Sequence, residues 1–455
     1  MPQTRCGGSV DRMSPATHLQ ILRWRVEDHL RHSPRLRTAL ALWHWLRSRL
    51  DPRPVAQIRH LGKALGLAEH PAVARLLTED FRFLLRPDLE PAWRAAVAGH
   101  PRYAPLLRDQ PLLTRSVVLK APVDGEKGVL LNYFEYNLAR VLALGDTDLA
   151  WLDTQYSLIF VASWSPTDYT LLGSALLRLK SPLFLQCANE AERTRLTALH
   201  PRLVVLPGLA CDWVDPAFYQ PRPMAERRID VLMVANWGEF KRHWDFFLAL
   251  RRLPADLRIV LIGQREGGRD RDFIERLARR LDVPQQLELL ESLPIERVTE
   301  LECDARVSVI LSRREGGCVA AVESLFAGCA LAMRADARIG SSAHINDRTG
   351  RRLRPGRIAE DLAALLAEAG SLDPRAWACA HIRHDLTLQR INLVLREQSL
   401  AAGLAWTTDL AVPHWRPHPT LAQAADRGRL RPAYTELHHR FPHLIGADLM
   451  ERSHR

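Results

Sequence analysis

The stretch from residue 307 to residue 333 constrains the fold of this chain more than any other. An apolar run, residues 307–311, leads through two arginines into Glu315-Gly316-Gly317. A segment rich in small and apolar residues follows, ends at Gly328, and precedes a second apolar run, residues 330–333. This order is typical of a strand, a turn, a helix and a further strand, and therefore of a parallel sheet covered by helices.

The Glu-Gly-Gly turn also has the chemistry of a binding site. Gly316 and Gly317 let the backbone approach a ligand and aim N–H groups at it, which suits a phosphate. Glu315 in the turn and Glu323 in the helix would grip hydroxyls on two parts of one ligand. The alternative is an ordinary strand–helix turn whose glutamates face solvent, and spacing alone leaves both interpretations open.

Glu315, Glu323, the two glycines and the run ESLFAG (residues 323–328) resemble the signature of retaining glycosyltransferases of family 4. The similarity covers roughly residues 113–410 and is strongest over residues 229–350. It implies an α/β chain with the GT-B fold, in which two Rossmann-like domains face a cleft. It also implies that Glu315 contacts the donor sugar, as a catalytic group, and that Glu323 binds the ribose of the nucleotide.

Length and composition fit a soluble protein of several domains. The chain has 455 residues, of which 47% are hydrophobic and 25% charged, with room for two or three domains. It has no apolar run long enough to span a bilayer, and its N-terminus lacks the apolar core of a signal peptide. Seven cysteines without paired spacing favour a reducing compartment, so a cytoplasmic protein is expected.

No metal is expected from the sequence. Cys379, His381 and His384 lie near one another, but no second ligand cluster completes a zinc pattern, so they are interpreted as structural. The resemblance agrees, because cations and a helix dipole already supply positive charge to the donor.

The net charge of +11 suits anionic partners such as nucleotide diphosphates, phospholipid headgroups or nucleic acid. An arginine excess can equally reflect a GC-rich genome. No basic run with interleaved aromatics resembles a nucleic-acid platform, so nucleic acid is not expected as a partner. Peripheral contact with the inner face of a membrane stays open, because charge alone does not separate lipid-linked from soluble acceptors.

The chain divides into four segments. Residues 1–112 read as a helical N-terminal extension, with apolar residues three or four apart and prolines between the helices. Within it, residues 61–77 share features with a helix-turn-helix, although a plain helical hairpin is favoured because no basic recognition face is aligned. Residues 113–225 and 226–372 read as two Rossmann-like domains, acceptor-side and donor-side. Residues 373–455 form a helical tail, which GT-B chains commonly return to the first domain.

The first α/β domain contains β-type runs at residues 116–119, 157–162, 183–187 and 203–206, separated by helical segments. The loop after the first run contains Gly125 and Lys127. It is predicted to bind at the first strand–helix junction, where the resemblance places acceptor and donor phosphates; a mere surface turn is the alternative.

Trp164 and Asp168 follow the second β-type run and would line an acceptor pocket, unless the tryptophan is simply a buried structural residue. Many family 4 enzymes carry a histidine in this domain near the reacting sugar. The only histidine between residues 114 and 222 is His200, in a His-Pro turn unsuited to that role.

The second α/β domain opens with an apolar strand at residues 229–234, followed by Lys241 and Arg242 at the start of a helix. Cations there can meet a diphosphate held at the helix N-terminus, although two solvent-facing bases are the plain alternative. In family 4 a lysine after this strand binds the donor diphosphate, and Lys241 matches it. The family's preceding arginine is Ala235 here, so Arg242, or Arg313 and Arg314, would substitute.

We therefore expect a hexosyltransferase-type enzyme of glycan biosynthesis. It would transfer a sugar from a nucleotide-diphosphate-sugar to a glycan or lipid-linked acceptor with retention of configuration, and would use no cofactor besides that donor. The chain contains neither a dinucleotide fingerprint nor an ATP-cradling loop. Two alternatives remain: a non-catalytic GT-B-like protein that binds a glycan or an anionic surface, and a nucleic-acid-binding protein that uses its basic helices.

Overall fold

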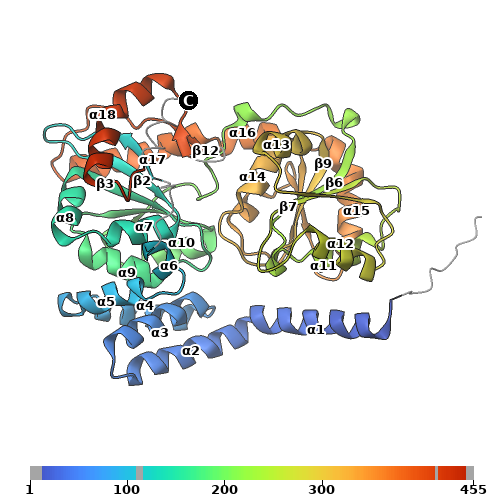
Figure 1. Ribbon diagram of the computed structural model, residues 1–455, viewed down its shortest axis with the longest axis horizontal. Coiled ribbons are helices and arrows are strands. Elements are labelled where there is room, and N and C mark those ends of the chain that lie inside the picture. The colour runs from blue at the N-terminus through green and yellow to red at the C-terminus, as the bar shows by residue number, and fades with distance from the viewer. Residues whose placement is uncertain (1–12, 109–115, 416–418, 447–455) are drawn as a thin grey trace, which may run out of the picture.

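The computed structural model describes residues 13–108, 116–415 and 419–446. They form a helical extension and two α/β lobes that lie side by side (Figure 1). The expected boundary between residues 112 and 113 lies outside the described residues.

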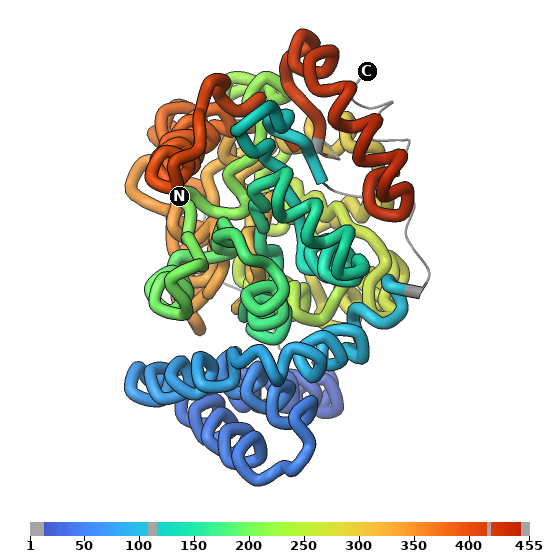
Figure 2. The backbone as a smooth tube through the Cα atoms, turned by 90° about the vertical axis from the view of Figure 1, so that its left-hand side faces the viewer, coloured from blue at the N-terminus to red at the C-terminus, as the bar shows by residue number. Residues whose placement is uncertain are grey.

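Each of the first four helices of the extension begins with a proline. Proline has no backbone N–H, and this suits the first helical position because an N–H there would have no partner within the helix. Its elements are α1 (Pro15–His32), α2 (Pro34–Leu50), α3 (Pro54–Leu67), α4 (Pro71–Leu84), η1 (Pro87–Leu89), α5 (Glu90–Ala98) and α6 (Ala104–Arg108). Helices α3 and α5 pack against α9 (Tyr169–Arg178) of the first lobe, whereas α1 runs beneath the second lobe (Figure 1). There the rings of Trp24 and Trp244 lie 5.7 Å apart. The extension is thus a layer beneath both lobes (Figure 2).

The first lobe is built on a five-stranded sheet of order β1-β2-β3-β4-β5, in which only β1 is antiparallel. Its strands are β1 (Ser116–Lys120), β2 (Gly128–Tyr133), β3 (Tyr156–Val161), β4 (Leu183–Gln186) and β5 (Leu203–Val205). Its helices are α7 (Glu135–Leu142), α8 (Asp146–Gln155), α9 (Tyr169–Arg178) and α10 (Glu190–Thr197). Strand β2 is buried along its whole length, because helices and the C-terminal segment cover the sheet.

The second lobe is a doubly wound parallel sheet of order β11-β10-β9-β6-β7-β8. Its strands are β6 (Ile229–Val234), β7 (Ile259–Gly263), β8 (Leu287–Glu291), β9 (Ala305–Ile310), β10 (Ala330–Arg334) and β11 (Gly350–Leu353). Its helices are α11 (His243–Leu250), α12 (Arg271–Arg280), α13 (Ile295–Cys303), α14 (Val319–Phe326) and α15 (Ile358–Glu368), with short 3₁₀ turns η2 (Pro216–Phe218), η3 (Met224–Glu226), η4 (Glu239–Lys241), η5 (Gly340–His344) and η6 (Ala369–Ser371). The strand order reverses between β6 and β9.

The C-terminal segment crosses back to the first lobe. Helix α16 (Pro374–His381) packs on α14, and α17 (His384–Ala401), β12 (Pro413–Trp415), β13 (Pro419–Leu421) and α18 (Ala424–Arg440) follow it. Ile391 of α17 and Leu437 of α18 are buried in the core of the first lobe. The Tyr434 hydroxyl accepts a hydrogen bond from the Val118 N–H at 2.9 Å.

The predicted fold class is confirmed: the chain has two Rossmann-like lobes in the GT-B manner, with a helical N-terminal region. None of the described helices contains a stretch apolar and long enough to cross a bilayer.

Candidate functional site

Lys241 and Glu315 meet at the point where the strand order of the second lobe reverses. Lys241 lies in the loop after β6 and Glu315 in the loop after β9, and these two strands are neighbours in the sheet. Lys241 Nζ lies 2.7 Å from Glu315 Oε2, and each side chain is 13% exposed. In open α/β sheets ligands bind outside the carboxyl ends of the strands at such a reversal. The two side chains therefore stand where this architecture places a ligand.

The ion pair leaves one carboxylate oxygen uncommitted. Burial lowers the pKa of Lys241, but the Glu315 carboxylate opposes it, and the net result is a pKa above the usual value. The lysine is therefore a fixed positive charge at neutral pH. Glu315 Oε1 is buried and has no hydrogen-bond partner among the described residues. A buried acceptor of this kind is costly unless a ligand hydroxyl or water satisfies it.

Gly316 and Gly317 lie at a close contact between the lobes. A Cβ on Gly316 would overlap the carbonyl oxygen of Ser163, and a Cβ on Gly317 would lie 2.9 Å from Cys211 Cβ. Their carbonyl groups accept hydrogen bonds from the N–H groups of Gly340 and Ser341, at 2.8 and 3.0 Å. The close approach of the first lobe is thus one physical reason for two glycines here, besides the phosphate contact expected from the sequence.

Glu323 lies near the same turn. It is half-buried in α14, and its carboxylate acts on Cys318, the residue that precedes this helix. Burial raises the pKa of Cys318 to about 12; Glu315 and Glu323 act in the same direction, and Lys241 opposes them. The two predicted carboxylates and the predicted lysine therefore surround one thiol.

Arg242 is engaged by carboxylates of its own chain. Its guanidinium pairs with Asp28 of α1 and, at 3.0 Å, with Asp245, and it lies over the Trp244 ring. The residue is 5% exposed, so it reaches a ligand only if one of these carboxylates gives way. The sequence assigned Arg242 directly to the substrate; the pairing with Asp28 was not foreseen.

Three further arginines also form ion pairs with carboxylates of the extension. Arg313 pairs with Asp28 at 2.7 Å, and Arg314 pairs with Glu69 at 2.9 Å. Glu69 also pairs with Arg338. We call Arg242, Arg313, Arg314 and Arg338 the arginine cluster. A cavity of about 250 Å³ lies between α1 and this part of the second lobe. The extension therefore neutralises the basic groups that flank Lys241 and Glu315.

Gly125 and Lys127 lie at the wrong edge of the first sheet to meet a cleft ligand, and their assignment to the substrate is corrected. Residues 128–133 form strand β2, not a helix, so the preceding loop is the turn of an antiparallel hairpin. Lys127 Nζ donates to Ser181 Oγ at 2.6 Å, just before β4 begins. The loop thus faces the amino ends of the parallel strands, opposite the ligand-binding edge.

The side chains of Trp164 and Asp168 contact Tyr103 of the extension. The Trp164 ring stacks on Tyr103 with centroids 5.5 Å apart, and the Tyr103 hydroxyl donates to Asp168 Oδ2 at 2.6 Å. Asp168 also caps α9 through the N–H groups of its first turn. Both side chains anchor the extension to the first lobe, which fits the structural alternative for Trp164; their place in an acceptor pocket stays a prediction.

The sequence reading missed Glu135, which follows β2 at the carboxyl edge. Glu135 Oε1 accepts from the N–H groups of Ser163 and Trp164 at 3.0 and 2.8 Å, and Oε2 accepts from Ser163 Oγ at 2.5 Å. Had residues 128–133 been recognised as a strand, a carboxylate directly after it would have been a candidate.

Glu135 is expected to make the stability of the folded protein depend on pH. Burial raises its pKa to about 7, although the hydrogen bonds it accepts act against this. A raised carboxyl pKa means that the folded state binds more protons, so the free energy of unfolding falls as pH rises from about 4.5 to 7. Glu135→Gln should remove a penalty of up to about 3 kcal/mol at pH 8, with little effect at pH 4.5. Urea unfolding at both pH values tests this, and equal effects would contradict it.

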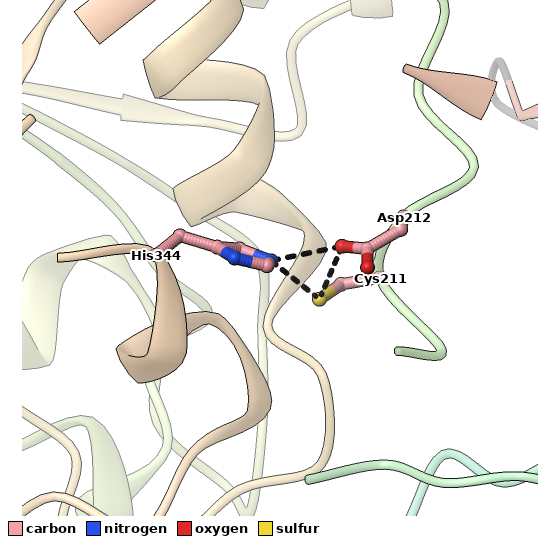
Figure 3. Close-up of side chains that lie close together, drawn as sticks. All are labelled: Cys211, Asp212 and His344. Carbon is pink, nitrogen blue, oxygen red and sulfur yellow. Dashed lines mark hydrogen bonds and ion pairs between the residues drawn. The ribbon is translucent and has the colours of Figure 1, made fainter. Parts of the chain in front are cut away.

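Cys211, Asp212 and His344 meet between the lobes (Figure 3). His344 Nε2 lies 2.8 Å from Asp212 Oδ1, and Cys211 Sγ lies 3.5 Å from the same oxygen. They are the one group in the described part of the chain whose donor atoms converge as metal ligands do. Two ligands of tetrahedral zinc would be about 3.3 Å apart, whereas 2.8 Å is a hydrogen-bond distance. The group fits better as a hydrogen-bonded contact that joins the lobes.

Comparison with known proteins bears on the second lobe. Residues 217–377 match the family model "Glycosyl transferases group 1". The second lobe carries a group 1 glycosyltransferase domain. This group 1 domain contains both Lys241 and the turn from Glu315 to Gly317; the first lobe and the extension lie outside the match. A search of curated proteins found no match.

Solved structures resemble the chain at low identity. Sucrose-phosphate synthase from Thermosynechococcus elongatus is 14% identical over 60% of this chain and 74% of its own, with a TM-score of 0.46. Anabaena Alr3699/HepE in complex with UDP and glucose is 16% identical over 60% and 77%, with a TM-score of 0.41. The pneumococcal O-GlcNAc transferase GtfA is 15% identical over 54% and 53%, also at 0.41. These likenesses concern the fold, and no residue's role is taken from them.

Proposed function

We propose that the chain transfers a sugar from a nucleoside-diphosphate-sugar to the hydroxyl of an acceptor, with retention of configuration. The observation that carries this proposal is the Lys241–Glu315 pair, which lies at the strand reversal of the group 1 domain. A cation and a carboxylate with one uncommitted oxygen suit a ligand that carries both a diphosphate and sugar hydroxyls. The acceptor is a glycan or a lipid-linked molecule in this proposal.

In the reaction, the bond between the anomeric carbon and the diphosphate oxygen breaks, and a bond to the acceptor oxygen forms. Negative charge grows on the departing diphosphate, where Lys241 would stabilise it; preorganised electrostatic contacts of this kind usually contribute more to catalysis than any other effect. Glu315 would hold hydroxyls of the donor sugar, and the departing phosphate would receive the acceptor proton. Arg242 would join Lys241 after Asp28 releases it.

Glu323→Ala is expected to weaken binding of the donor nucleotide and to change turnover less. A lost hydrogen bond to a charged group costs about 1.5–3 kcal/mol, which corresponds to a roughly 10- to 150-fold rise in Kd. Calorimetric titration with UDP, GDP and ADP, beside steady-state kinetics with the matching nucleotide-sugars, gives both quantities. Glu315→Ala should show the reverse pattern, with a larger loss in kcat than in nucleotide affinity.

Glu302→Ala, a substitution on α13, serves as a matched loss of a carboxylate within the same lobe. If Glu323→Ala and Glu315→Ala both bind nucleotide and turn over as the wild type does, the assignment of the two carboxylates is wrong. If the wild-type protein binds none of the three nucleoside diphosphates, the proposed function itself is wrong.

A further inference from the structure

A second, apolar pocket lies against Gly317 of the glycine turn, and no member of the arginine cluster is among its described lining residues. Its volume is about 150 Å³. The first lobe contributes residues after β2, β3 and β5 and from β12, and the second lobe contributes the start of α14. The residues that matter below are Tyr133, Ser163, Trp213, Trp415, Gly317 and Val319. The pocket thus opens at the carboxyl ends of the first lobe's strands and meets the turn that carries Glu315.

Aromatic rings form the walls of this pocket. The rings of Tyr133 and Trp415 have centroids 5.2 Å apart, and those of Tyr133 and Trp213 are 6.1 Å apart at 78°. Trp213 is held in place because its Nε1–H donates to Gln186 at 2.6 Å. The indole N–H of Trp213 is therefore already hydrogen-bonded within the protein. Apolar walls of this kind suit an apolar ligand group.

Two hydroxyl groups supply the polar contacts that such a pocket needs. The Tyr133 hydroxyl is buried and has no hydrogen-bond partner among the described residues, and Tyr133 is 3% exposed. Ser163 Oγ is oriented by Glu135, to which it donates. Ser163 is also the residue whose carbonyl meets Gly316, so it stands where the pocket joins the donor turn. Ligand pockets typically combine apolar walls with a few such fixed polar groups.

We propose that this pocket binds an apolar part of the acceptor, an aryl ring or a short alkyl chain attached next to the hydroxyl that receives the sugar. This inference rests on the proposed function. A cavity of about 150 Å³ with apolar walls accommodates a group the size of benzene. Within the proposed acceptor classes, this favours a sugar that carries an aryl or alkyl group, and Ser163 is a positioning residue for the acceptor hydroxyl.

The first test measures binding and does not depend on turnover. Benzyl alcohol and a series of n-alkanols from ethanol to hexanol are titrated into the full chain and followed by ligand-observed NMR, with glycerol as the polar control. Each methylene that enters the pocket should tighten binding about four-fold until the pocket is full. Val319→Phe, which fills the pocket from the second lobe, should abolish binding. Val123→Phe, the same substitution on an exposed hairpin, should not.

A second variant keeps the inference testable if Val319→Phe does not fold. Trp415→Ala enlarges the pocket, so affinity should shift from benzyl alcohol towards 2-naphthylmethanol by about ten-fold. Equal affinities for the whole alkanol series, or binding that survives Val319→Phe in a folded protein, would overturn the inference. No binding of any alcohol by the wild type would also overturn it.

Transfer assays separate this inference from the proposed function. With a nucleotide-sugar whose nucleotide binds by calorimetry, kcat/KM should be at least ten-fold higher for phenyl and hexyl glucosides than for methyl glucoside. Equal values would overturn the apolar acceptor and leave the glycosyl transfer intact. Absence of nucleotide binding would instead refute the donor site, whatever the alcohols do.

Discussion

Lys241→Ala is expected to lower the rate of glycosyl transfer by about 10²- to 10³-fold, the usual effect of removing one preorganised electrostatic contact. Lys241 is the cation that stands beside Glu315 at the strand reversal, 2.7 Å from its carboxylate. Without it the growing charge on the diphosphate loses its partner. The buried Glu315 carboxylate also loses its counter-ion, so the variant should be less stable by about 3 kcal/mol. Steady-state kinetics and urea unfolding measure the two effects.

Lys127→Ala is the matched control for this prediction. Lys127 is likewise a half-buried lysine with hydrogen-bonded partners, but it lies at the amino edge of the first sheet. Its loss should affect stability and leave nucleotide binding and turnover near the wild-type values. A larger kinetic effect at Lys127 than at Lys241 would contradict the placement of the donor at the strand reversal. The double variant Lys241→Ala/Glu315→Ala should recover part of the lost stability.

Neutralising Asp28 and Glu69 together is expected to loosen the extension and to strengthen nucleotide binding. These two carboxylates, 17% and 9% exposed, pair with all four members of the arginine cluster. The same arginines are the groups that a diphosphate would attract. In Asp28→Asn/Glu69→Gln the arginines lose their internal anions, so the affinity for UDP or the matching nucleotide should rise about ten-fold, equivalent to about 1.4 kcal/mol. Calorimetry at low salt measures it.

Loosening of the extension is followed separately by limited proteolysis. Ser33 separates α1 from α2, and trypsin should cut nearby arginines faster in the double variant, because α1 loses its ion pairs to the second lobe. The control is Glu79→Gln/Asp88→Asn, which removes two exposed carboxylates from the same extension. Unchanged proteolysis and unchanged nucleotide affinity in Asp28→Asn/Glu69→Gln would show that the extension neither docks through these pairs nor competes with the ligand.

The second lobe was largely predictable from the sequence. Its strands β6, β9 and β10 are predominantly apolar, as expected of a parallel sheet covered on both faces. Lys241 and Glu315 lie in the loops that follow two of these runs, β6 and β9. Local pattern places both residues at strand ends, and the topology then makes those ends adjacent. The strand order, however, depends on pairing between distant segments, which a single sequence does not reveal.

The first lobe and the extension were harder to predict, for two different reasons. Residues 128–133 form a short apolar run without alternation, and such a run does not distinguish a buried strand from a helix by period alone. The error moved Gly125 and Lys127 to the wrong edge of the sheet. The partners of the arginine cluster, Asp28 and Glu69, lie more than 200 positions away in sequence from Arg242 and Arg314. No local pattern marks a contact of that range.

The most direct test of the central claim is a crystal structure of the full chain with a bound nucleoside diphosphate chosen by calorimetry. The account predicts diphosphate oxygens within about 3 Å of Lys241 Nζ, outside the carboxyl ends of β6 and β9, with the ribose towards Glu323. Displacement of Asp28 from Arg242 should accompany binding. A nucleotide bound elsewhere, such as beside Lys127 at the amino edge of the first sheet, would contradict the account.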